Sequence, residues 1–69
     1  MKKFNVEISG SATVTHETDT LAGLKKIAKR AQGNISVAEG NRETFFGTPT
    51  QLLDAIALAE EYGRDTLDK

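Results

Sequence analysis

The feature that most constrains this chain is a helix in its second half, because the residues that begin and end it are both recognisable. Thr48 and Gln51 have the Thr-x-x-Gln spacing of a capping box, and Pro49 suits the first helical position. Gly63 follows the last apolar residue, where a left-handed glycine commonly ends a helix. We therefore predict a helix over residues 49–62 that ends at a left-handed Gly63.

The apolar arc of this helix is wider than a single sheet can cover. At about 100° per residue its apolar side chains extend past half of the circumference, while Asp54 and Glu61 occupy the opposite side. Contiguous apolar surface that the core does not cover usually marks an interface. We therefore predict that Ala55, Leu58 and Tyr62 belong to a protein interface.

Two strand patterns precede the first helix. Apolar and polar residues alternate over 4–8, and the alternation resumes over 12–16 after a glycine-containing break. Either one long strand bent at Gly10 or a hairpin with a three-residue loop explains this pattern. The hairpin is favoured because it keeps the apolar side chains on one face. Its predicted pairs are Ile8 with Ala12, Val6 with Val14 and Phe4 with His16.

A second amphipathic helix is predicted over residues 19–32. Thr18 or Asp19 would cap its N-terminus, and a left-handed Gly33 would end it. Its apolar residues fall within roughly 120° of arc, which is enough to cover one face of a sheet. Four basic residues occupy the far side of this helix: Lys25, Lys26, Lys29 and Arg30.

A second hairpin is predicted around the dipeptide Gly40-Asn41, which fits a two-residue turn between strands. Because neighbouring strand residues point to opposite faces, Phe45 and Phe46 cannot both enter one core. The two-residue turn places Phe45 beside Ser36 on the face away from the core, and a longer loop would exchange the two phenylalanines. We therefore add Phe45 to the predicted interface.

The order strand–strand–helix thus occurs twice, and a shift of 31 residues superimposes most of the apolar positions of the two halves. Either an internal duplication or the same patterning rules applied twice explains this similarity. Both predict an α+β domain of ββαββα order over residues 1–63, in which two helices cover one face of an antiparallel four-stranded sheet. Residues 64–69 are polar and aperiodic, so we expect a frayed tail.

The chain lacks the residues that most catalytic and metal sites require. It contains no cysteine and a single histidine, His16, which excludes disulfides, thiolate sites and histidine-rich zinc sites. No serine has an oriented base, and the glycines form no phosphate-binding loop. We therefore expect a protein that is not an enzyme and that has no cofactor, metal or small-molecule substrate.

The charge is unevenly distributed along the chain. Residues 1–33 hold six Lys or Arg and three Asp or Glu, whereas residues 34–69 hold three and seven, and the net charge is −1. Such a balance argues against a general polyanion binder. No stretch has the apolar length of a signal peptide or a membrane span. Together with the absence of cysteine, this predicts a cytoplasmic protein that does not bind membranes.

These features predict a non-enzymatic protein-interaction module and a candidate homodimer, since so small a core gains from association. Its size and lack of catalytic groups suit a small inhibitor or regulator of a larger complex, including those that phages encode. The predicted interface consists of Ala55, Leu58, Tyr62 and Phe45. The alternative is a nucleic-acid-binding domain with phosphate contacts through Lys25, Lys26, Lys29 and Arg30.

Overall fold

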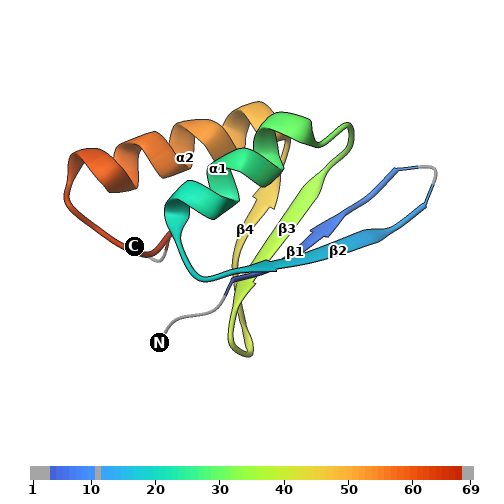
Figure 1. The fold of residues 1–69 in the computed structure, drawn as a ribbon, viewed down its shortest axis with the longest axis horizontal. Helices are drawn as coiled ribbons and strands as arrows, with labels where there is room; N and C mark the ends of the chain where they lie inside the picture. Colours follow the sequence, from blue (N-terminus) through green and yellow to red (C-terminus); the bar gives the residue numbers. More distant parts are fainter. Residues whose placement is uncertain (1–3, 11, 68–69) are drawn as a thin grey trace.

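The computed structural model describes residues 4–10 and 12–67 and has the predicted α+β architecture (Figure 1). Four strands form one antiparallel sheet in the order β2-β1-β3-β4, and both helices lie on the same face of it. The elements are β1 (Phe4–Ile8), β2 (Val14–Thr18), α1 (Leu21–Arg30), β3 (Ile35–Glu39), β4 (Arg42–Gly47) and α2 (Pro49–Glu61). No helix within these residues has both the length and the hydropathy needed to span a bilayer.

The core lies between the two central strands and the helices. Its buried side chains come from alternate residues of β1 and β3 and from one stripe of each helix: Phe4, Val6, Ile35, Val37, Leu21, Leu24, Ala28, Leu52, Ile56 and Ala59. The three from α2 follow the spacing i, i+4, i+7, which places them in line on one side of a helix. The two central strands therefore supply the sheet side of the core, and the edge strands contribute no fully buried residue.

Helix α2 begins and ends as its sequence predicts. The Thr48 hydroxyl accepts a hydrogen bond from the Gln51 backbone N–H at 3.2 Å, and the Gln51 side-chain oxygen accepts one from the Thr48 N–H at 3.0 Å. This is a complete capping box. At the other end, Gly63 has a φ of 70°, the left-handed conformation expected of a residue that ends a helix.

Helix α1 is shorter than predicted and is bounded by different residues. The N-cap is Thr20, whose hydroxyl accepts a hydrogen bond from the Gly23 N–H at 3.1 Å, so the predicted caps Thr18 and Asp19 were wrong. The helix ends at Ala31, which is extended. Gly33 was also predicted wrongly, because Gly40 and Gly63 are the only glycines among the described residues with a positive φ.

The β1–β2 hairpin is present, but its register differs from the prediction by two residues. Ile8 pairs with Val14, Val6 with His16 and Phe4 with Thr18, so the connection spans residues 9–13. A shift of two residues leaves each side chain on the predicted face, because side chains alternate with a period of two. The sequence pattern therefore determined the faces of the hairpin but not the length of its loop.

A bulge in β4 reverses which of the two adjacent phenylalanines faces the core. The Gly40-Asn41 turn joins the paired residues Glu39 and Arg42, but Thr44 is an extra residue in the ladder, which shifts the pairing. As a result Phe45 packs against the core, and Phe46 lies on the opposite face with 63% of its surface exposed. The expectation that Phe45 lies away from the core was therefore wrong.

Candidate interaction groove

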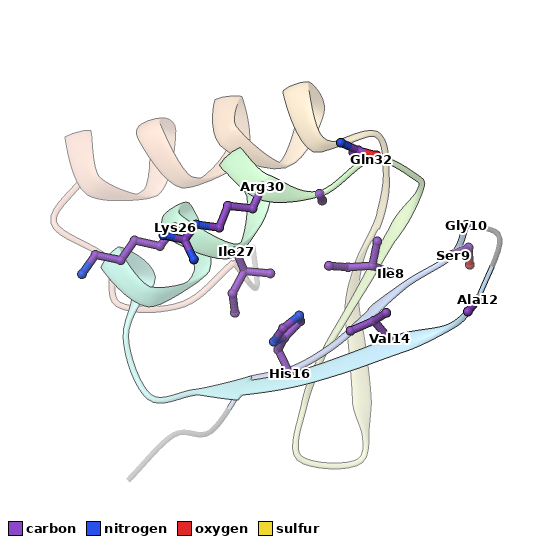
Figure 2. Close-up of a pocket in the computed structure, with 11 residues that line it drawn as sticks. Ile8, Ser9, Gly10, Ala12, Val14, His16, Lys26, Ile27, Arg30 and Gln32 are labelled. Carbon is purple, nitrogen blue, oxygen red and sulfur yellow. The ribbon is translucent and has the colours of Figure 1, made fainter.

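A groove separates helix α1 from the β1–β2 hairpin (Figure 2). We call it the α1–hairpin groove, and its volume is about 530 Å³. Ile8, Val14 and His16 point into it from the strands, and Ile27 points into it from the helix. Lys26 and Arg30, on the same helix, also line it. The groove is therefore apolar inside and carries positive charge on its helical side.

The groove exists because the helices leave most of strand β2 uncovered. Val14, Thr15, His16 and Glu17 are all exposed, and Val14 retains 46% of its surface although it shares a sheet face with the buried Val6. A strand that alternates between apolar and polar residues ordinarily buries one of its faces. In β2 most of that face is uncovered, and it forms one wall of the groove.

Gly23 allows the first turn of α1 to lie directly against the C-terminal end of β2. A Cβ atom at Gly23 would overlap the Thr18 hydroxyl and lie 2.9 Å from the Thr18 Cβ, so no larger residue fits without a shift. Gly23 is therefore a glycine of close approach in a helix where alanine would otherwise be the better helix former. The first turn of α1 and the end of β2 therefore meet at this glycine, at one end of the groove.

Gly33 holds the other end of the groove in place by a second close approach. A Cβ atom at Gly33 would overlap the Ser9 carbonyl oxygen and lie 2.8 Å from the Ser9 carbonyl carbon. The Ser9 N–H donates a hydrogen bond to the Asn34 carbonyl oxygen at 2.8 Å beside this contact. The segment that follows α1 is thus fixed to the end of β1, which sets the distance between the helix and the hairpin.

The predicted basic face of α1 divides into two parts. The Lys25 ammonium pairs with the Glu60 carboxylate at 2.9 Å, and this ion pair joins α1 to α2. Within residues 4–10 and 12–67, Lys26, Lys29 and Arg30 have no carboxylate partner, and all three are exposed. Lys26 and Arg30 are one helical turn apart and line the groove, whereas Lys29 does not line it.

The predicted interface on α2 is partly accessible. Leu58 and Tyr62 are 51% and 66% exposed, while Ala55 is half-buried and Phe45 packs against the core. The Arg64 guanidinium lies 5.7 Å from the centre of the Tyr62 ring, a distance typical of a cation–π contact. Of the four predicted interface residues, Leu58 and Tyr62 are thus accessible to a partner protein.

The face of the sheet away from the helices, which we call the open face, carries negative charge. Glu7 and Glu17 point to it because they alternate with groove and core residues, and Glu43 joins them from β4. The Ser36 hydroxyl donates a hydrogen bond to the Glu43 carboxylate at 3.2 Å. Phe46 pairs with Ser36 across the strands, and its exposed ring lies on this face. The two sides of strand β2 therefore have opposite charge.

Sequence reasoning missed the α1–hairpin groove, although each of its residues belongs to a predicted element. The one signal in the sequence was Gly23, because glycine inside a predicted helix is a poorer helix former than alanine. Within the described residues, no three His, Asp or Glu side chains gather as a metal site, and His16 has no carboxylate beside it in the groove. No family model, curated protein or solved structure matches this chain.

Proposed function

We propose that this chain is a non-enzymatic protein-interaction module and that the α1–hairpin groove is its main binding surface. The supporting observation is an accessible apolar groove with two cations, beside a strand at the edge of the sheet. Exposed apolar surface with a polar rim commonly marks a site of interaction with another protein. By binding a segment of a larger protein in this groove, so small a chain would act as an inhibitor or regulator of that protein.

A polypeptide suits the groove better than a nucleic acid does. Ile8 and Val14 offer apolar contacts, which a phosphate backbone cannot use, and Lys26 and Arg30 provide only two positive charges in the groove. The carboxylates of the open face would repel a polyanion that extended beyond β2. A polypeptide with both apolar and acidic side chains would satisfy the apolar wall and the cations together.

Selection from a displayed peptide library tests this proposal without a partner being named in advance. Random peptides would be selected on the immobilised chain and then measured against two variants, Val14→Asp and Thr15→Asp. Both residues are exposed on β2, but Val14 points into the groove and Thr15 points to the open face. We expect enriched peptides that lose binding to Val14→Asp and retain it with Thr15→Asp. No enrichment, or equal loss with both variants, would contradict the proposed function.

The second candidate function is binding to nucleic acid, and the observation that favours it is the row of exposed cations on α1. Lys26, Lys29 and Arg30 are exposed on one helix, and contacts to phosphates would release counterions. Lys29→Glu separates the two functions, because Lys29 does not line the groove. It should weaken binding to a labelled single strand or duplex at low salt but leave peptide binding unchanged. Absence of any wild-type shift at about 50 mM salt would remove this candidate.

A further inference from the structure

We infer that the α1–hairpin groove binds an extended segment of a partner as a fifth strand on the outer edge of β2. This inference rests on the proposed function and specifies the form and the chemistry of the partner. Three observations carry it: the unprotected edge of β2, the apolar groove beside that edge, and the opposite charges on the two sides of the strand.

The two edges of the sheet differ in how they are protected. Natural edge strands avoid pairing with other chains through bulges, prolines or lysines. Strand β4 carries a bulge at Thr44, whose hydroxyl also donates a hydrogen bond to the Val37 carbonyl. Strand β2 reads Val-Thr-His-Glu-Thr, pairs with β1 without a register shift, and contains neither proline nor lysine. Among the described residues no strand pairs with its outer edge, so β2 is the edge that can accept another strand.

The length of β2 sets the length of the segment that it can bind. Five residues at about 3.4 Å each extend over roughly 17 Å, so a partner segment of about five residues would pair with the whole strand. Alternate side chains of that segment would lie beside Val14 and His16 at the groove. The others would lie beside Thr15 and Glu17 on the open face.

The charges on either side of β2 then specify the partner's sequence pattern. On the groove side, Lys26 and Arg30 face no carboxylate among the described lining residues. On the open face, the Glu7 carboxylate lies on the neighbouring strand β1, opposite Thr15 of β2. The bound segment should therefore alternate, with apolar and acidic side chains towards the groove and basic or neutral ones towards the open face. Each exposed charge pair should change affinity by about two- to fivefold.

Amide measurements on the isotope-labelled chain test the strand addition directly. The probe is a seven-residue peptide with Val and Glu at odd positions and Thr and Lys at even positions. Its control exchanges Glu and Lys, so that composition and alternation are retained and the charges are reversed. We expect the probe at millimolar concentration to shift the amide signals of β2 and to slow hydrogen exchange at alternate β2 residues, because only alternate N–H groups point away from β1. The control peptide should bind several-fold more weakly.

Backbone methylation of the probe separates strand addition from simple groove binding. Methylating the N–H groups of odd residues, or those of even residues, removes one of the two rows of donors. We expect one methylated probe to lose binding by at least tenfold and the other to stay within about threefold, because an added strand uses a single row of N–H groups. Equal behaviour of the two probes, or unchanged β2 exchange in the presence of the unmethylated probe, would overturn strand addition. Library peptides that depend on Val14 would still support the proposed function in that case.

Discussion

Replacing Gly33 with alanine should destabilise the fold, although nothing in the backbone conformation of Gly33 forbids a side chain. Its φ is not positive, so alanine at such a position would ordinarily stabilise a protein by reducing the entropy of the unfolded chain. The obstacle is the Ser9 carbonyl, which a Cβ atom would overlap. To make room, the end of β1 must move away from the segment that follows α1, and the Ser9–Asn34 hydrogen bond lies at that contact.

The magnitude follows from three terms. Steric overpacking costs about 1–3 kcal/mol, and weakening the Ser9–Asn34 hydrogen bond costs about 0.5–1.5 kcal/mol. The reduced entropy of the unfolded chain offsets about 0.4–1 kcal/mol. We therefore expect Gly33→Ala to lower the free energy of unfolding by about 2 kcal/mol. A domain of this size has a total stability of roughly 3–10 kcal/mol, so the loss is a substantial fraction.

Urea denaturation followed by circular dichroism measures this change, and Gly10→Ala is the matched control. Gly10 also lacks a positive φ, but the nearest atom to its hypothetical Cβ, the Ala12 carbonyl oxygen, is 3.9 Å away. The control should be neutral or slightly stabilising, whereas Gly33→Ala should lower the thermal midpoint by about 10 °C. If the two variants unfold at the same urea concentration, the close approach does not hold the groove and our account of Gly33 is wrong.

Three further predictions concern helix α2. In urea denaturation, Ile56→Ala should lower the free energy of unfolding by about 2–5 kcal/mol because Ile56 is fully buried, whereas Leu58→Ala should lower it by under about 1 kcal/mol. Equal losses of stability would contradict the orientation of the helix. Thr48→Ala should cost about 0.5–2 kcal/mol through loss of the N-cap, with Thr50→Ala as the control that leaves the capping box intact. Leu58→Asp should convert a homodimer to a monomer in light scattering, and a monomeric wild type would remove α2 as a self-association surface.

The parts of the fold that the sequence predicted are those with local causes. The capping box of Thr48 and Gln51 and the left-handed Gly63 depend on residues within one turn of each other, and all three are as expected. The faces of the strands also follow from local alternation. The bulge at Thr44 has no counterpart in the sequence pattern, because one extra residue in the ladder depends on how β4 packs against its neighbours.

The groove was not predictable because it depends on contacts between residues distant in sequence. The alternation over 12–16 correctly marked Val14 as facing the helical side of the sheet, but not that the helices leave it uncovered. The position of α1 over the hairpin is fixed where Gly33 meets Ser9, 24 residues away, and such a contact has no periodic signature. Gly23 is the part of this arrangement that a sequence can signal, because a glycine inside a predicted helix has a lower helix propensity than alanine.

The expectation of a frayed tail does not hold for Thr66 and Leu67, which connect the end of helix α2 to the sheet. The Thr66 hydroxyl donates a hydrogen bond to the Glu39 carboxylate at the end of β3, and Leu67 packs against the core. Truncating the chain after Gly63, where hydropathy alone would end the domain, would remove this apolar contact and the hydrogen bond to Glu39. Shortened versions of the protein should therefore retain Leu67, and an affinity tag should be joined beyond it.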